Sequence, residues 1–411
     1  MPRPAHQLVH KLAELGQVSD ERGALTRTFL SPAMRRANKL VGTWMREAGL
    51  SVRVDTAGNL VGRLASTDKK AKTLLLGSHL DTVRDAGKFD GALGVLLPIV
   101  ALGELRRRGV VLPFHVEVLG FSEEEGVRFA SAYLGSKAYC GRLRAGDLAL
   151  CDTDGVSVRQ AFEKFNRGKF APPAAAHRRG DLLGYLEIHI EQGPVLEAEK
   201  LAVGIVSAIA GQSRFKLTWT GKAGHAGTTP MMLRRDALAG AVEFIAGVEA
   251  IARRKPGLVA TVGTLTVSPG AANVIPGVVT HTLDVRHAKD SMRRAALMQI
   301  GRLATQIATR RRLERHWQRT QENGAVACSP QLTTALARSV RAVQGKSISL
   351  VSGAGHDAVV MASLAPVAML FVRSRGGLSH HPDEYTSPPD LDVALRVVLD
   401  FLERLSRESA K

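Results

Sequence analysis

The chain has 411 residues, of which 45% are hydrophobic and 23% charged, and its formal net charge is +18. This composition is typical of a globular protein of two or three domains, and no apolar run approaches the roughly 20 residues that span a membrane. The N-terminus lacks an apolar block before a small-residue cleavage site, and the scattered Cys140, Cys151 and Cys328 favour neither disulfides nor a thiolate metal site. We therefore expect a cytoplasmic protein without a membrane partner.

The positive charge is spread along the chain rather than collected in one segment. Basic clusters occur at Arg35–Arg36, Arg106–Arg108, Arg178–Arg179, Arg234–Arg235, Arg253–Lys255 and Arg310–Arg312. Because aromatic residues make up only 5% of the chain, these clusters have little material for stacking on bases. We expect a solvated basic surface and no nucleic-acid partner. A positive field that draws in an anionic substrate is compatible with the same charge.

The first half of the chain alternates between helical and strand patterns. Apolar residues at helical spacing predict helices in residues 8–16, 31–50 and 91–109. Alternating polarity around a turn at Ala57–Asn59 predicts a hairpin in residues 51–64. Further strands are predicted at residues 73–79, 113–122 and 184–193, the first of them buried on both faces. This order predicts an α/β domain with a mixed, mostly parallel sheet covered by helices.

A different pattern begins near Ile209 and ends near Cys328. It has the order strand–helix–strand–strand–helix, at residues 214–221, 237–255, 258–267, 278–286 and 291–311. After Cys328 the α/β pattern returns, ending in a long helix at residues 392–408. We therefore predict a catalytic domain of residues 1–211 and 328–411, interrupted by a smaller α+β domain of residues 212–327.

Four segments place histidines or carboxylates at or beyond the ends of predicted strands. They are His79-Leu80-Asp81 with Asp90, Glu123-Glu124-Glu125, Glu187 to Gly193 around His189, and Ser379 to Glu384 around His380 and His381. Charged groups at a strand end lose hydration, so a salt bridge, a hydrogen-bond network or a metal ion must compensate them. A single such histidine is more often a packed residue than a ligand. Four segments together favour a site, because sites form at the carboxyl ends of strands in open α/β sheets.

The residue types in these segments suit metal-assisted hydrolysis. Nitrogen and oxygen ligands without thiolates suit zinc, manganese or cobalt. Two ions that share one carboxylate would polarise a water, and a free carboxylate nearby would serve as general base. Residues two apart in an extended segment point the same way, so Asp81 could reach His79 and fix its tautomer. Gly91 would let the backbone turn tightly beside Asp90, and Asp85 is expected to be solvated.

The motifs GSHLDT, FDG, EEEG, HIEQGP, GHAGTTP, SGAGHD and SHHPDE occur in this order over nearly the whole chain. They resemble the motifs of the M20-type metal-dependent amidohydrolases. Within this family the chain is similar to the hydantoinase/carbamoylase branch, with its allantoate amidohydrolases, N-carbamoyl-L-amino-acid hydrolases and β-ureidopropionase. The resemblance implies two divalent metal ions per subunit, zinc or manganese. It also implies a homodimer and an inserted ferredoxin-like domain that acts as lid and dimerisation domain.

The resemblance implies roles for the residues of the four segments. One ion would be held by His79, Asp90 and His189, and the other by Asp90, Glu125 and His380, with Asp90 bridging. Glu124 would be the catalytic base that takes a proton from the bridging water and passes it to the leaving nitrogen. Asp81 would orient His79, and Glu123 would be a spectator.

Residues of the predicted inserted domain match the family as well. His225, in GHAGTTP, would stabilise the oxyanion, in the active site of the partner subunit. Taken alone, this stretch is an ordinary strand–helix loop. Arg286 would bind the substrate carboxylate with two parallel hydrogen bonds, with Asn273 beside it. His356 and Asp357 lie near the site in the family, and a structural hydrogen-bond pair is an equally good expectation for them.

The substrate implied by the resemblance is a ureido group near a carboxylate, hydrolysed with release of carbon dioxide and ammonia. The runs Gly211–Arg214 and Arg373–Gly377 look more like those of the allantoate enzymes. Allantoate has two ureido arms, so Arg214 would supply an extra donor, and Gln192 and Gly377 are further expected substrate contacts. Hydrolysis of allantoate to ureidoglycine or ureidoglycolate is therefore our first expectation. An N-carbamoyl-L-amino-acid hydrolase or β-ureidopropionase is the second, and a non-catalytic basic binding protein the third.

Overall fold

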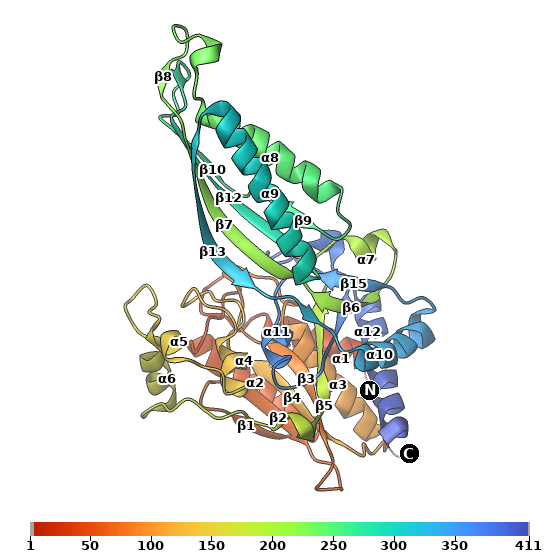
Figure 1. Cartoon of the computed structure of the whole chain (residues 1–411). Helices are drawn as coiled ribbons and strands as arrows, with labels where there is room; N and C mark the ends of the chain where they lie inside the picture. Colours follow the sequence, from red (N-terminus) through yellow and green to blue (C-terminus); the bar gives the residue numbers. More distant parts are fainter. Residues whose placement is uncertain (1–3, 410–411) are drawn as a thin grey trace. The chain divides into compact units, whose positions relative to one another are not determined.

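A computed structural model of the chain describes residues 4–409 (Figure 1). The described chain divides into two compact units, one of residues up to Ser207 and from Cys328 onward, and one of residues Ala208–Ala327. None of the described helices is both long and apolar enough to cross a membrane.

A nine-stranded sheet has the order β1-β2-β4-β3-β5-β16-β6-β14, in which β15 also pairs with β6, and all of its strands lie in the first unit except β14 and the end of β6. Its strands are β1 (Ser51–Val54), β2 (Leu60–Leu64), β3 (Thr73–His79), β4 (His115–Phe121), β5 (Leu182–Ile190), β6 (Val203–Ile209), β14 (Val326–Ala327), β15 (Ser349–Ser352) and β16 (Val367–Val372). The predicted hairpin is confirmed, with Val54 opposite Leu60.

The sheet is mixed, as predicted, but it is parallel mainly in its centre. The neighbours β4, β3, β5 and β16 run parallel to one another. The pairs β1-β2, β2-β4, β16-β6 and β6-β14 are antiparallel. The expectation of a mostly parallel sheet was therefore wrong for its margins. The hairpin of β1 and β2 needs no crossover helix, so its short connection allows antiparallel pairing.

Helices cover both faces of this sheet. They are α1 (Pro4–Leu15), α2 (Pro32–Glu47), α3 (Ala92–Arg107), α4 (Leu134–Tyr139), α5 (Ala145–Ala149), α6 (Val158–Asn166), α7 (Val195–Ala198), α10 (Pro330–Gln344), α11 (Ala358–Met361) and α12 (Pro388–Ser409), with short 3₁₀ turns η1 (Arg179–Asp181) and η3 (Arg375–Gly377). Helices α1, α2, α3, α10 and α12 share one apolar core with Leu74, Leu76 and Ile188 of the central strands. Helix α11 contacts α4 and the strands β5 and β16.

The sequence explains where helices α2 and α3 begin. Helix α2 starts where Ser31 accepts the N–H of Met34 and Pro32 occupies the first turn. Helix α3 starts at Gly91, whose φ of +64° favours glycine. Residues Ala92–Leu102 of α3 are all buried, which is why this helix is apolar all round rather than amphipathic.

The second unit is an antiparallel sheet with the order β10-β12-β7-β13, in which β9 also pairs with β12. Its elements are β7 (Gly211–Thr220), β8 (Gly224–His225), η2 (Met231–Leu233), α8 (Ala237–Arg253), β9 (Val259–Thr261), β10 (Leu265–Ser268), β11 (Val274–Ile275), β12 (Val278–His287), α9 (Asp290–Arg311) and β13 (Glu314–Asn323). Both helices pack on one face, where Phe215, Leu217 and Trp219 of β7 join their core.

Two elements of this unit differ from the sequence prediction. Residues 258–267 form two strands rather than one, because the hydroxyl of Thr282 accepts the N–H of Thr264 at 3.1 Å and replaces the ladder there. Strand β13 was not predicted. Most of its side chains are exposed, so the polar ERHWQRTQEN segment lacks the alternation that marks a half-buried strand.

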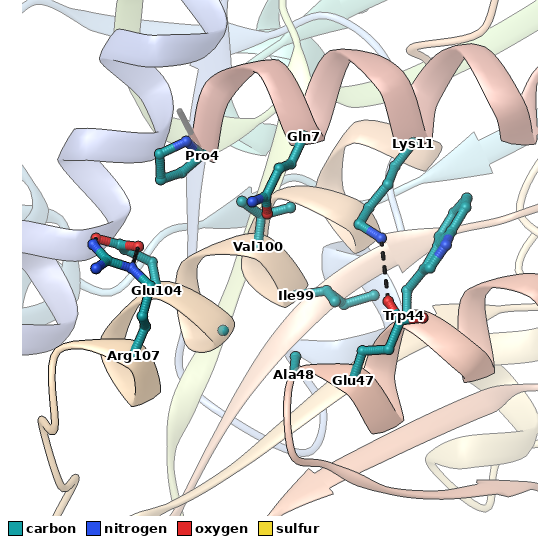
Figure 2. Close-up of a pocket in the computed structure, with 11 residues that line it drawn as sticks. Pro4, Gln7, Lys11, Trp44, Glu47, Ala48, Ile99, Val100, Glu104 and Arg107 are labelled. Carbon is teal, nitrogen blue, oxygen red and sulfur yellow. Dashed lines mark hydrogen bonds and ion pairs between the residues drawn. The ribbon is translucent and has the colours of Figure 1, made fainter. Parts of the chain in front are cut away.

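A cavity of about 620 Å³ lies between α1, α2 and α3 (Figure 2). Lys11 lies over the ring of Trp44, 4.4 Å from its centroid, and its ammonium is 3.7 Å from Glu47. The last two turns of α3 line this cavity, whereas Asp90 precedes the first turn. The sequence-predicted site residues, all of which are described, do not line it.

Candidate metal centre and active site

Three neighbouring strands bring the predicted ligands to one edge of the sheet. His79 is the last residue of β3, His189 is next to last in β5, and Glu124 follows the end of β4. In the parallel register His79 is paired with Phe121, so the ends of β3 and β4 lie side by side. Segments far apart in the sequence therefore meet where the carboxyl ends of the strands meet.

Asp90 lies at the centre of this group. Its Oδ1 is 3.3 Å from Nε2 of His79 and 3.1 Å from Nε2 of His189. Its Oδ2 is 3.5 Å from Nε2 of His380, which is also 3.5 Å from Oε1 of Glu125. The two carboxylate oxygens thus face two different sets of ligand atoms. The ligand atoms of His79, Asp90 and His189, and those of Asp90, Glu125 and His380, all lie within 4.8 Å of one another in each set.

The buried imidazoles are oriented by the main chain. Nδ1 of His79 lies 3.0 Å from the carbonyl oxygen of Asp81, and Nδ1 of His189 lies 2.9 Å from that of Ile190. When Nδ1 donates to a carbonyl, Nε2 keeps its lone pair and becomes the ligand atom. Both Nε2 atoms face Asp90, so the donor set fits a metal ion. The carboxylate of Asp81 is farther from His79, at 3.4 Å, than its own carbonyl.

Asp81 also organises the acidic loop after β4. Its carboxylate accepts the N–H of Glu124 at 3.0 Å and that of Glu125 at 3.1 Å. Glu123 turns away from the ligands and accepts the N–H groups of Gly126 and of Leu134, the latter at 2.9 Å. Two buried carboxylates therefore fix the backbone from which Glu124 and Glu125 project.

The other two carboxylates of this loop, Glu124 and Glu125, are removed from water without enough positive charge nearby to balance them. Desolvation raises the pKa of Glu124 well above its ordinary value, reinforced by the neighbouring Glu125 and Asp357. Desolvation likewise raises the pKa of Glu125 to about 8. Burial would lower the pKa of His79, but hydrogen bonds to Asp81 and Asp90 outweigh it and raise it. A cluster that holds excess negative charge in a buried place is suited to a cation.

The segment around His380 closes the site from the other side. The hydroxyl of Ser379 lies 2.6 Å from Oδ2 of Asp90, and Nε2 of Gln192 lies 2.7 Å from the same oxygen. Oε1 of Gln192 is buried and has no hydrogen-bond partner within residues 4–409. Gln192 and His380 both adopt left-handed backbone, with φ of +56° and +57°. Such strain in non-glycine residues is concentrated at functional sites.

Three glycine positions are required by close approach. A Cβ on Gly91 would lie 2.4 Å from the ring of His79, so the predicted tight turn beside Asp90 is confirmed. A Cβ on Gly377 would lie 2.4 Å from the carbonyl carbon of Gly193, next to Gln192. A Cβ on Gly87 would lie 2.3 Å from the Cβ of Glu384.

Sequence reasoning missed two buried charged residues at the site. Glu384 accepts the N–H groups of Phe89 at 2.9 Å and Asp90 at 3.0 Å, and its other oxygen is 3.0 Å from Ser379. Arg27 is 1% exposed and donates to the carbonyl of Leu80. Glu384 belongs to the motif SHHPDE, so the sequence placed it near the site. It did not show that the Glu384 side chain points toward the backbone of Phe89 and Asp90. No motif or strand-end pattern around Arg27 in the sequence pointed to a role at the site.

Asp85, His356 and Asp357 can be compared with their expectations. Asp85 is exposed, as predicted. His356 bonds to Ser352, with Nε2 2.8 Å from the hydroxyl, rather than to Asp357. Both carboxylate oxygens of Asp357 are buried without a hydrogen-bond partner among the described residues. The expected hydrogen-bond pair was therefore wrong, because His356 turns to the side of β15.

The predicted substrate residues of the second unit form two groups. Asp284 is bonded by Arg214, by Arg286 and by Gln212, with Nε of Arg214 at 2.8 Å and Nη2 of Arg286 at 2.8 Å. His225 pairs with Val274 in the two-stranded β8-β11 ladder, and the carbonyl of Asn273 accepts the N–H of Ala226 at 2.9 Å. Both groups lie within residues 208–327.

Comparison with known proteins identifies the family. Residues 75–404 match the model of Peptidase family M20/M25/M40, whose members are metal-dependent. The chain is 41% identical to the allantoate deiminase of Arabidopsis thaliana, over 97% of this chain and 82% of that protein. It is 40% identical to the N-carbamoyl-L-amino acid amidohydrolase of Geobacillus stearothermophilus, over 98% of both.

A solved structure agrees over the whole chain. The amidase of the hydantoinase/carbamoylase family from Burkholderia multivorans superposes with a TM-score of 0.91 at 33% identity, covering 97% of each chain. The aminopeptidase PepT of Bacillus cereus, at 17% identity and a TM-score of 0.66, shares the fold alone. The buried ligand cluster, the matched motifs and these relatives together show that the chain is an amidohydrolase that belongs to Peptidase family M20/M25/M40.

Proposed function

We propose that this enzyme hydrolyses a ureido C–N bond near a carboxylate, with allantoate as its substrate. The observation that carries the proposal is the position of Asp90, whose two oxygens face two ligand sets, next to the buried Glu124. One set would be His79, Asp90 and His189, and the other Asp90, Glu125 and His380. Two divalent ions, zinc or manganese, would supply an acidified water and a polarised ureido carbonyl there.

Glu124 is the proposed proton carrier. Its carboxylate projects from the loop that Asp81 holds, and burial favours its protonated form. It takes the proton of the attacking water and donates it to the leaving nitrogen as the C–N bond breaks. Carbamate then leaves and decomposes to carbon dioxide and ammonia. A raised pKa suits this role, because the group has to be protonated midway through the reaction and deprotonated at its end.

Gln192 supports a ureido substrate in particular. Its buried Oε1 has no hydrogen-bond partner in the described part of the chain, while a ureido group offers N–H donors. An unpaired buried acceptor costs free energy, so a donor that satisfies it gains correspondingly. Gly377 is a further proposed substrate contact, and its lack of a side chain lets the backbone of Gly193, next to Gln192, pack closely against it.

Arg286 is the proposed carboxylate-binding residue, with Asn273 beside it. Asp284 bonds to Nε and Nη2 of Arg286 and so fixes the plane of the guanidinium. Arg214 uses Nε and Nη1 for Asp284 and Gln321, which leaves Nη2 for the second ureido arm. An oriented guanidinium loses less entropy when it binds a carboxylate.

His225 is the proposed oxyanion donor, acting in the site of a partner subunit. It is exposed in its own unit, and its Nδ1 accepts the N–H of Gly227 at 3.1 Å, which leaves Nε2 as the donor. The proposal therefore includes a homodimer in which residues 212–327 serve as a ferredoxin-like lid and dimerisation domain. The exposed Met231, Met232 and Leu233 follow the same loop and suit burial at an interface.

An N-carbamoyl-L-amino-acid hydrolase is the second candidate. It is favoured by the near-equal identity to the two curated relatives, 41% and 40%. Both substrates present a ureido group and a carboxylate, so the same Gln192 and Arg286 would bind either. The extra donor of Arg214 is what favours allantoate.

Ammonia release from the purified enzyme, loaded with zinc or manganese, tests the two candidates. Allantoate is compared with N-carbamoyl-L-alanine, N-carbamoyl-L-methionine and N-carbamoyl-β-alanine. We expect kcat/KM for allantoate to exceed the others at least tenfold. The reverse order assigns the enzyme to the second candidate. Arg214→Gln is the matched variant: it should lower kcat/KM for allantoate and leave the carbamoyl amino acids unchanged.

A further inference from the structure

A second cavity, of about 450 Å³, lies between α2, β1 and the end of α6, within the first unit. Figure 1 shows α2 and β1 in the red to orange part of the chain. Strand β1 is the edge of the nine-stranded sheet. The cavity shares no residue with the candidate metal centre, so whatever it binds is separate from the proposed hydrolysis.

Four basic side chains line this cavity. Arg35, Lys39 and Arg46 come from α2, and Arg53 comes from β1. At 100° per residue, positions 35, 39 and 46 fall within about 40° of one another around the helix. They therefore form one stripe, and Arg53 faces it from the strand.

These charges are not neutralised by neighbours. Lys39, Arg46 and Arg53 are exposed, and within residues 4–409 no side-chain hydrogen bond or ion pair engages them. Asp55 is the single carboxylate among the described lining residues. Its oxygens already accept the N–H of Ala57 and the amide of Asn59. Burial raises the pKa of Asp55, and its hydrogen bonds to Asn59 and Ala57 and the charge of Arg53 oppose this. One carboxylate stands against four basic side chains in the described lining.

The cavity is also lined by the apolar residues Val52, Val54, Leu60 and Phe165. The guanidinium of Arg35 lies 3.9 Å from the ring centroid of Phe165 and donates to the carbonyl of the same residue. This contact fixes the position of a guanidinium on which a planar ring can stack. Val52 and the 44% exposed Val54 extend the apolar lining along β1.

We propose that this cavity binds a small phosphorylated ligand with a planar ring, of the nucleoside diphosphate type. Three cations without partners suit two adjacent phosphates, which carry more charge than one carboxylate. The Arg35–Phe165 contact suits the base, and the volume lies within the range of small-molecule sites. This inference goes beyond the proposed hydrolysis and accounts for part of the positive charge of the chain.

Calorimetric titration of the full-length protein with ADP, and separately with inorganic pyrophosphate, tests the proposal without any substrate. The site variant is Lys39→Gln/Arg46→Gln/Arg53→Gln. The control is Lys69→Gln/Lys70→Gln/Lys200→Gln, which removes the same charge at exposed positions of the same unit. We expect wild type and control to bind ADP alike, the site variant to bind at least tenfold more weakly, and pyrophosphate to bind at least tenfold more weakly than ADP.

Three results would overturn the proposal: no binding of ADP, equal affinity for ADP and pyrophosphate, or equal weakening in both triple variants. The last would assign binding to the overall field of the protein rather than to this cavity. The single variant Lys39→Gln, expected to bind ADP severalfold more weakly, guards against misfolding of the triple variant. Because binding is measured in the absence of turnover, its failure leaves the proposed hydrolysis untouched, and the reverse also holds.

Discussion

The candidate residues of the two units are held in opposite ways. In the first unit His79, Asp90 and His189 are each at most 5% exposed, whereas the side chain of His380 is 49% exposed. The positions of the three buried residues are fixed by one another and by the main chain. In the second unit His225, Asn273 and Arg214 are exposed on a two-stranded ladder and a sheet face.

This difference separates two kinds of site residue. A buried ligand set is arranged before anything binds, and its excess negative charge is the driving force for taking up cations. Exposed residues gain a defined environment only when another surface or a substrate covers them. The first group should therefore control chemistry and metal content, and the second should control binding of the substrate.

The largest effect should come from the buried group. Glu124→Gln removes the proton carrier and should lower kcat by about 10²–10⁴-fold, the usual contribution of general acid–base catalysis. KM and metal content, measured by atomic emission, should stay near wild type. Retention of most of the turnover would remove Glu124 from its role. Because the buried carboxylate is destabilising, the metal-free variant should unfold at an equal or higher urea concentration than wild type.

Arg286→Lys tests the substrate-binding residues of the second unit, with a smaller effect; the Arg286 side chain itself is 27% exposed. Lysine keeps the charge but loses the planar pair of hydrogen bonds, which are worth roughly 1.5–3 kcal/mol to a charged partner. We expect kcat/KM to fall about 10–100-fold, through KM, with metal content unchanged. A fall in kcat at constant KM would contradict the division between chemistry and binding. Lys216→Arg, on the exposed side of β7, is a control for surface changes in this unit.

The smallest effect on turnover is expected for a buried carboxylate outside the site. Glu117 accepts from Arg63 at 2.7 Å, Tyr139 at 2.8 Å and His177 at 3.1 Å. Burial would raise the pKa of Glu117, but these partners outweigh burial and lower it to about 2. Its stabilisation is thus present above pH 4.5 and is lost as the pH falls toward 2.

Glu117→Gln should leave kcat unchanged and lower the free energy of unfolding at pH 7 by about 2–3 kcal/mol. Urea unfolding of wild type and variant between pH 7 and pH 2 checks this, and the difference between the two curves should narrow steadily below pH 4.5. A constant difference at every pH would show that packing, not charge, is what Glu117 contributes. The contrast with Glu124→Gln then distinguishes a compensated carboxylate from an uncompensated one.

Most elements with a strong local pattern were predictable. The hairpin of β1 and β2 alternates in polarity, as a half-buried hairpin should. The buried strands β3 and β5 and the helix α3 are largely apolar runs, as their burial requires. Strand β13 was not predictable, because an edge strand with exposed side chains has no apolar alternation. The antiparallel margins of the first sheet were missed because strand direction depends on which neighbours pair, and a short run does not specify its neighbour.

The sequence by itself determined which residue types gather at the strand ends, and the order of its motifs determined the family. Only the tertiary structure decided how those residues face one another. Nδ1 of His79 lies closer to the carbonyl of Asp81 than to its carboxylate, and Glu384 reaches back to the N–H groups of Phe89 and Asp90. The physical reason is that a motif fixes spacing along the chain. Hydrogen-bond direction and burial depend on segments nearly 300 residues apart that meet only in the fold.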